Sequence, residues 1–179
     1  IKCDWSSDVC SSDLVITAVT ASQKAGMALL VVFYVLTALG ITVGFHRLLT
    51  HRSFEAVRPL RIALAVLDSM AYQGGPIGWV AGHRRHHALS DRPGDPHSPH
   101  PMPGDAAGPI RSFIHGHIGW LFGSMTISPE RYAPDLLDEP DMVRIDRLFP
   151  VFSVLSLALP AAIGFVLGGT HAALTAFLW

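Results

Sequence analysis

The sequence predicts an all-α integral membrane protein in which spanning helices flank a cytosolic helical cap. Half of its 179 residues are hydrophobic and only 15% are charged, against about 25% in an average soluble domain. Two long stretches contain no charged side chain, and nine of the ten histidines lie between them. The net charge of -1 is not that of a nucleic-acid-binding domain, so no nucleic-acid partner is expected.

Residues 1–14 are interpreted as a sequencing-adapter artefact. The stretch DWSSDVCSSDL, from Asp4 to Leu14, resembles the translation of a common short-read adapter and has no apolar core of a secretory signal. We therefore expect the natural protein to begin no earlier than Val15, and we infer no disulfide or thiol chemistry from Cys3 and Cys10. An adapter at one end also suggests truncation at the other.

The spanning helices are predicted from runs of uncharged residues. Residues 25–45 read AGMALLVVFYVLTALGITVGF, and 21 helical residues at about 1.5 Å each match a hydrocarbon core of about 30 Å. Residues 148–170 predict a second span, in which Pro160 is tolerated as a kink. Residues 171–179 are read as the start of a further, truncated span.

The intervening residues 46–147 are predicted to form a cytosolic cap. They hold 11 of the 13 Lys and Arg residues, and the positive-inside rule places such segments in the cytoplasm. Residues 60–80 predict an interfacial helix followed by a turn, because Arg61 and Asp68 interrupt the apolar pattern.

Two further elements of the cap are read from turn and cap residues. Residues 91–111 are rich in Pro, Gly and Asp and predict a loop. Ser128, followed by Pro129, predicts the start of a helix that runs toward Leu137.

Five histidines within the cap form the strongest chemical signal. His46 and His51 are five positions apart, which on a straight α-helix separates them by roughly 140°, so they share a face only where the helix loosens. His83, His86 and His87 stand at offsets of three and four, on one helical face. Imidazole binds Zn, Cu, Fe and Ni, so the pattern predicts a metal site without naming the metal.

The alternative reading of these clusters is membrane anchoring. A histidine at a membrane interface is often a polar anchor, and the nearby arginines are typical positive-inside anchors. Two histidine clusters, each beside arginines, favour metal binding over that alternative.

Four segments together carry a family resemblance. They resemble the membrane-bound acyl-CoA fatty acid desaturases of the stearoyl-CoA, delta-9 type, particularly the bacterial members, over about residues 25–179. The segments are GITVGFHRLLTHRSF (40–54), QGGPIGWVAGHRRHHALSD (73–91), GDPHSP (94–99) and HIGWLF (117–122).

The resemblance implies a four-helix membrane anchor with a cytosolic cap that holds two Fe ions mainly through histidine. Such enzymes use O2 and two electrons to introduce a cis double bond into a saturated acyl chain. Matched position by position, the first histidine box supplies two iron ligands and the second supplies three: His46, His51, His83, His86 and His87.

Residues around the boxes are assigned supporting roles on the same basis. Asp91, Asp95 and His97 are candidates to hydrogen-bond the ligand histidines, since each bound imidazole needs an acceptor for its second ring N–H. Trp79 and Trp120 are candidates to line a substrate tunnel, although core packing explains each of them as well. Arg84 and Arg85, within the second box, are candidates to contact the phosphates of an acyl carrier. Both also fit as ordinary membrane-interface anchors.

The implied partners are membrane lipid, a fatty acyl-CoA or other acyl carrier, and an external electron donor of the ferredoxin or cytochrome b5 type. The expected location is the bacterial inner membrane, with the histidines on the cytoplasmic side. The family's third histidine box is absent from these 179 residues, so the fragment as written is expected to be inactive.

Two other functions fit parts of the sequence. A membrane di-iron hydroxylase of lipids or alkanes has the same kind of metal centre but usually spaces its histidine boxes differently. A histidine-rich metal-binding or transport protein is expected to carry ionisable residues inside its spans, and residues 25–45 contain none.

Overall fold

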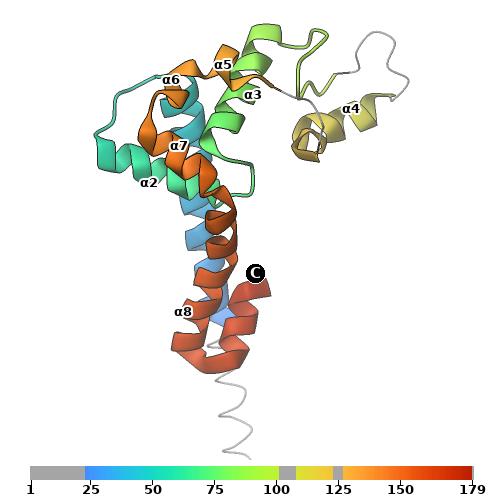
Figure 1. The fold of residues 1–179 in the computed structure, drawn as a ribbon. Coiled ribbons are helices and arrows are strands. Elements are labelled where there is room, and N and C mark those ends of the chain that lie inside the picture. The colour runs from blue at the N-terminus through green and yellow to red at the C-terminus, as the bar shows by residue number, and fades with distance from the viewer. Residues whose placement is uncertain (1–22, 101–107, 123–126, 179) are drawn as a thin grey trace, which may run out of the picture. The chain divides into compact units, whose positions relative to one another are not determined.

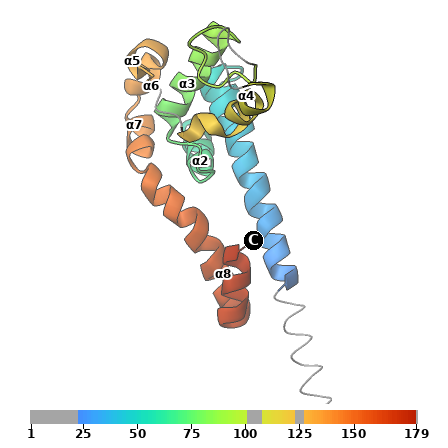
Figure 2. The same cartoon turned by 90° about the vertical axis from the view of Figure 1, so that its right-hand side faces the viewer.

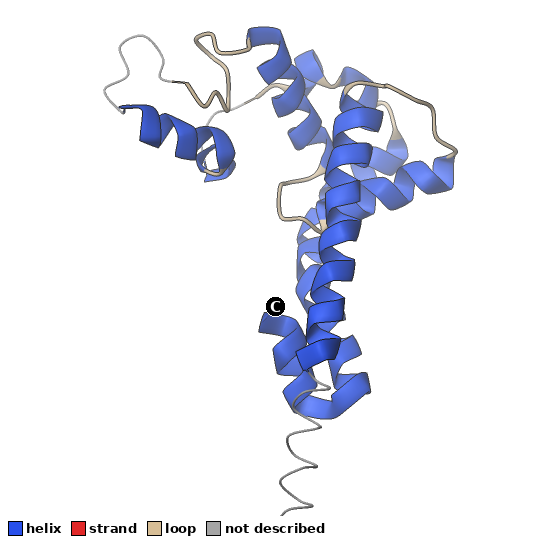
Figure 3. Cartoon of the chain, turned by 180° about the vertical axis from the view of Figure 1, so that it is seen from behind, coloured by secondary structure: helices blue, strands red, loops and turns tan. Residues whose placement is uncertain are grey.

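The computed structural model describes residues 23–100, 108–122 and 127–178. Within this part of the chain the secondary structure is helical, without a strand (Figure 3). The predicted adapter artefact at residues 1–14 lies outside the described residues. The contacts divide the chain into two compact units, one of residues 37–152 and one that joins residues up to Leu36 with residues 153–178.

The first long helix runs from Gln23 to Thr50, and it is long and apolar enough to cross a membrane. Its last part, η1 (Gly40–Thr50), is a π-helix, in which backbone hydrogen bonds join residues five apart. The helix therefore continues beyond the predicted span and carries the first histidine box on its final turn.

The last helix, α8 (Phe149–Leu178), is the second one with the length and apolar composition of a span. It is two helical stretches joined at Gly168 and Gly169, and the φ of +70° at Gly169 is one that glycine adopts readily. The stretches pack closely, since a Cβ at Gly164 would lie 2.5 Å from the carbonyl oxygen of Ala172. Figure 2 shows the second stretch of α8 turning back along the first.

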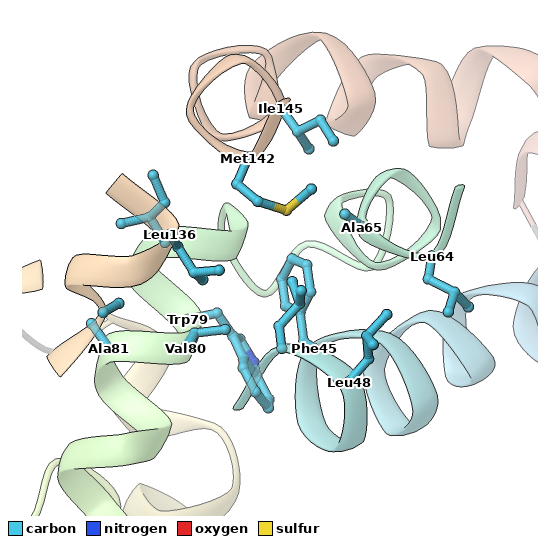
Figure 4. Close-up of a cluster of buried hydrophobic side chains, with 13 residues drawn as sticks. Phe45, Leu48, Leu64, Ala65, Trp79, Val80, Ala81, Leu136, Met142 and Ile145 are labelled. Atoms are coloured by element: carbon cyan, nitrogen blue, oxygen red, sulfur yellow. The ribbon is translucent and has the colours of Figure 1, made fainter. Parts of the chain in front are cut away.

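Within the larger unit, η1 and five of the helices pack together as one group (Figure 1). Its core is apolar and lies between η1, α2 and α3 and the short helices that follow (Figure 4). Phe45 and Val80 are fully buried at its centre. The five helices are α2 (Arg58–Ser69), α3 (Pro76–Leu89), α5 (Pro129–Tyr132), α6 (Pro134–Leu137) and α7 (Pro140–Arg147).

A proline in the first turn begins each of these five helices, where its missing N–H costs nothing and its φ is already helical. The prediction of one continuous helix from Ser128 toward Leu137 is wrong, because α5 ends at Tyr132 and a separate helix, α6, begins at Pro134. Proline disfavours the α conformation in the residue that precedes it. Ala133, which precedes Pro134, accordingly has a φ of -139°.

The remaining described helices are α4 (Gly108–His117) and the 3₁₀ turn η2 (Gly119–Phe122). The predicted loop at 91–111 extends too far, because residues 108–111 form the first turn of α4. Pro109 favours a helix start at that point. Residues 101–107 of the predicted loop lie outside the described part of the chain.

Two arginines connect α2 to the region of α7. Arg58 donates to both carboxylate oxygens of Asp141 at 2.6 and 2.9 Å. Arg61 donates in the same bidentate way to Glu139 at 2.9 and 2.7 Å. These paired bonds fix the geometry of α2, which packs against η1.

Candidate metal centre

The first histidine pair is brought together by the π-helical geometry of η1. The backbone N–H of His51 donates to the carbonyl oxygen of His46 at 3.0 Å, a bond between residues five apart. Their Nε2 atoms then lie 3.2 Å from each other. The loosened helix that the spacing required is therefore present at this point of the chain.

The second histidine pair lies one turn apart on α3. The Nε2 atoms of His83 and His87 are separated by 3.1 Å, as expected for residues at an offset of four. The start of this helix is held from outside, because the carboxylate of Asp146 in α7 accepts the backbone N–H of Ile77 at 3.0 Å. A Cβ at Gly75 would clash with that carboxylate, so the close approach requires glycine there.

The two pairs face each other across η1 and α3. Ligand atoms of His46, His51, His83 and His87 all lie within 4.8 Å of one another. The ring centroids of His46 and His83 are 4.9 Å apart, and those of His51 and His87 are 4.6 Å apart. Nitrogens that share an ion at about 2.0–2.1 Å lie about 3.0–3.4 Å from each other, so the observed separations within each pair fit a common metal.

The electrostatic environment favours neutral imidazole on α3. Burial, together with neighbouring His46 and His87, lowers the pKa of His83 to about 3. Burial and nearby His51 likewise lower the pKa of His87. Both rings are therefore neutral at pH 7, which is the form that binds a metal ion.

His86 is held beside this group rather than within it. Its Nδ1 lies 2.8 and 2.9 Å from the two carboxylate oxygens of Asp95. Burial alone would raise the pKa of Asp95, but hydrogen bonds from His86 and from the backbone of Asp91 and His97 lower it. Because the carboxylate is ionised, Nδ1 carries the proton and Nε2 keeps its lone pair for a ligand.

The other two predicted supporting residues have different surroundings. The ring of His97 stacks on that of His86, with centroids 3.9 Å apart. The side chain of Asp91 accepts a hydrogen bond from the hydroxyl of Ser98 at 2.5 Å. Of the two carboxylates named from the sequence, Asp95 is thus the one that contacts a histidine of the second box.

Both predicted tunnel tryptophans adjoin the histidines. Trp79 is buried and stacks on His83, with centroids 4.7 Å apart. Trp120 packs against His97, with centroids 5.3 Å apart. Trp79 also donates its indole N–H to the side-chain oxygen of Gln73 at 3.0 Å, a contact that the sequence pattern alone did not indicate.

The two arginines of the second box differ in what surrounds them. The guanidinium of Arg84 bonds protein atoms of η1, α5 and α6, including the carboxylate of Asp135 at 2.6 Å. Arg85 lies beside Gly94, where a Cβ would be 3.4 Å from its Nη2. Arg84 and Asp135 are 51 residues apart and no spacing rule connects them, so their contact has no signal in the sequence.

Comparison with known proteins identifies relatives of this chain. The family model for fatty acid desaturases matches residues 24–179. A hex-5-enoyl-[acyl-carrier protein] acetylenase of Moorena producens is 38% identical over 86% of this chain and 49% of its own length. An sn-1 stearoyl-lipid 9-desaturase of Anabaena variabilis is 37% identical over 75% and 46%.

A human relative extends the comparison to animals. Stearoyl-CoA desaturase 5 is 42% identical over 68% of this chain and 35% of its own length. The chain therefore spans less than half the length of each of these three relatives. Since the family model covers most of the chain, including both histidine boxes, the chain belongs to the fatty acid desaturase family.

Proposed function

We propose that this chain is part of a membrane fatty-acyl desaturase that introduces a cis double bond, at the delta-9 position, into a saturated acyl chain. The observation that carries this proposal is the convergence of four histidine side chains from two separate helices within 4.8 Å. Membership of the desaturase family narrows the chemistry of such a centre from metal binding in general to acyl oxidation.

The chain's own residues supply ligands and an apolar cover on one side of the group. His46, His51, His83 and His87 would hold iron, and His86, whose Nδ1 is hydrogen-bonded to Asp95, would offer Nε2 as a ligand to a second ion. Iron with O2 supplies the oxidant that removes hydrogen from an unactivated methylene. Phe45 and Trp79 pack against each other beside the histidines, with centroids 5.5 Å apart, and exclude water from that side.

The proposed substrate is a fatty acyl group on CoA or another acyl carrier, since the relatives' names include acyl-carrier protein, lipid and CoA forms. Trp79 and Trp120 are proposed to line its path. Electrons come from an external donor of the ferredoxin or cytochrome b5 type. The proposed location is the bacterial inner membrane, with the histidines on the cytoplasmic side, as the excess of Lys and Arg in residues 46–147 favours.

The test is product analysis with the complete coding sequence that contains this chain, recovered by sequencing the source locus through both ends. The sequence is expressed in a bacterial host fed with saturated fatty acids, and the membrane lipids are analysed by mass spectrometry. We expect a new cis-alkene that disappears in His83→Ala and persists in His100→Ala, whose side chain is 69% exposed. An alcohol product would replace the proposal with a hydroxylase, and no product would contradict both.

A further inference from the structure

The guanidinium of Arg84, a residue of α3, bonds η1 and the two short helices α5 and α6. Arg84 directly follows His83 on α3, and its side chain is 18% exposed. Its Nη2 donates to the carbonyl oxygen of Leu49 at 2.7 Å and its Nε to that of Thr50 at 3.3 Å. Its Nη1 donates to the carbonyl oxygen of Tyr132 at 3.0 Å.

The two carbonyls on η1 belong to the last residues of that helix. Carbonyls at a helix C-terminus have no partner within the helix and need one from outside. Thr50 directly precedes His51, so the bonds from Arg84 hold the backbone at the point where His51 leaves the helix.

Asp135 holds Arg84 in place from α6. Its carboxylate accepts hydrogen bonds from Nη1 and Nη2 of Arg84 at 2.6 and 3.1 Å. This is the bidentate geometry that a guanidinium provides and an ammonium does not. The same carboxylate pairs with Arg52 at 2.5 Å. Both chain neighbours of His51, Thr50 and Arg52, are thereby connected to the Arg84–Asp135 pair.

We propose that Arg84 and Asp135 are positioning residues that set the distance between the two histidine pairs before metal binds. Neither side chain belongs to the converging ligand group; both act through the backbone on either side of His51 and through the helix that carries His83 and His87. A metal site needs its ligands placed within about 0.5 Å, and a backbone anchor at each pair meets this need. The inference rests on the proposed metal centre.

The test is Co²⁺ titration of the purified chain in detergent, with affinity measured by chelator competition. Arg84→Lys retains the positive charge but loses the planar guanidinium that bonds several acceptors at once. We expect its Co²⁺ affinity to fall at least 10-fold, the lower bound for loss of a residue that supports metal ligands. Asp135→Asn is expected to weaken binding similarly, and the double variant no further. Arg84→Ala should also weaken binding, whereas a purely electrostatic role of Arg84 predicts tighter binding because a nearby positive charge is removed.

The matched control is Arg61→Ala, which loses a bidentate pair of similar exposure that connects α2 with Glu139. We expect its Co²⁺ affinity to change less than twofold, although its loss of thermal stability should be comparable to that of Arg84→Ala. Wild-type affinity in Arg84→Lys would overturn the inference and leave the proposed function intact. An equal loss of affinity in Arg61→Ala would also overturn it, and a wild-type chain that takes up no Co²⁺ would overturn the metal centre together with the inference.

Discussion

At the scale of single residues, the candidate centre depends on which ring nitrogen each histidine presents. The pairs on η1 and α3 both meet through Nε2, while His86 presents Nδ1 to a carboxylate. A metal-binding histidine commonly donates its other ring N–H to such an acceptor. The arrangement therefore separates one histidine with a fixed tautomer from four whose nitrogens converge.

Loss of one converging histidine should abolish most of the metal affinity. In His51→Ala the group retains three imidazoles, and we expect Co²⁺ affinity to fall by more than the roughly 100-fold upper bound for loss of an outer-shell partner. Competition with a chelator measures the change, and His100→Ala serves as the matched control. Equal affinity in the wild type and His51→Ala would show that His51 is not a ligand.

Asp68 is predicted to make stability depend on pH. Burial raises the pKa of Asp68 to about 8, and the nearby backbone of Phe45 opposes this only in part. The folded chain thus keeps a proton that the unfolded chain releases near pH 4. Between about pH 4 and pH 8 the free energy of unfolding should fall as pH rises, by at most about 1.4 kcal/mol per pH unit.

A substitution at Asp68 separates its effect on the pH dependence of stability from the effect of the histidines. In Asp68→Asn the carboxyl is replaced by a group that does not ionise, so the variant should gain stability over the wild type as pH increases from 5 to 8. Thermal unfolding in detergent across this range measures the difference. A constant difference between the two proteins at all pH values would contradict the raised pKa.

At the scale of elements, helix ends determine where the histidines lie. The π-helical end of η1 aligns His46 with His51. The start of α3 is set by Pro76 and by the carboxylate of Asp146 on its first turn. The first pair is therefore aligned by a feature at the end of η1, whereas the second is aligned by regular α-helical spacing on a helix whose start is held by Asp146.

Removal of the cap on α3 should destabilise the larger unit. Asp146→Ala leaves the backbone N–H of Ile77 without its acceptor, and loss of a helix cap costs about 1 kcal/mol. In a chain of this size the unfolding temperature should fall by about 2–4 °C, measured by circular dichroism in detergent. Asp138→Ala, an exposed aspartate near α6, is the control and should change little; equal losses in both variants would exclude a specific capping role.

At the scale of the whole molecule, two long apolar stretches of helix precede and follow in sequence the segment that carries the histidine boxes. Most of their large apolar side chains are exposed to the surroundings, as with Val154 at 65% and Val166 at 84%. Exposed apolar surface of this extent requires a nonaqueous environment. This exposure and the kinship with membrane desaturases associate the chain with a membrane.

Sidedness can be predicted from the charge distribution. In spheroplasts of a bacterial host, with Cys3 and Cys10 changed to serine, Arg92→Cys should react with an impermeant maleimide only after lysis. Thr170→Cys, directly after the reversal of α8 at Gly168 and Gly169, should react in intact spheroplasts. Labelling of Arg92→Cys before lysis would place the histidines outside the cytoplasm and contradict the positive-inside prediction.

The sequence predicted the elements whose signals are local. The apolar runs indicated both long helices, and the offsets of three and four indicated a common face on α3. Pro134 is a local signal for the break at Ala133, which the predicted helix from Ser128 toward Leu137 does not contain. The contacts of Arg84 with Asp135 and of Gln73 with Trp79 were not predicted, since they depend on how separate helices pack.

The amino-acid sequence is enough to predict which histidines share a helical face and which runs are apolar enough to enter a membrane. Such properties follow from residue type and from the fixed period of a helix. The packed structure is needed to show that η1 loosens to align His46 with His51, that the two pairs converge, and that Arg84 connects their helices. Those outcomes depend on packing between distant segments, where a backbone carbonyl or a carboxylate finds its partner only once the helices are in place.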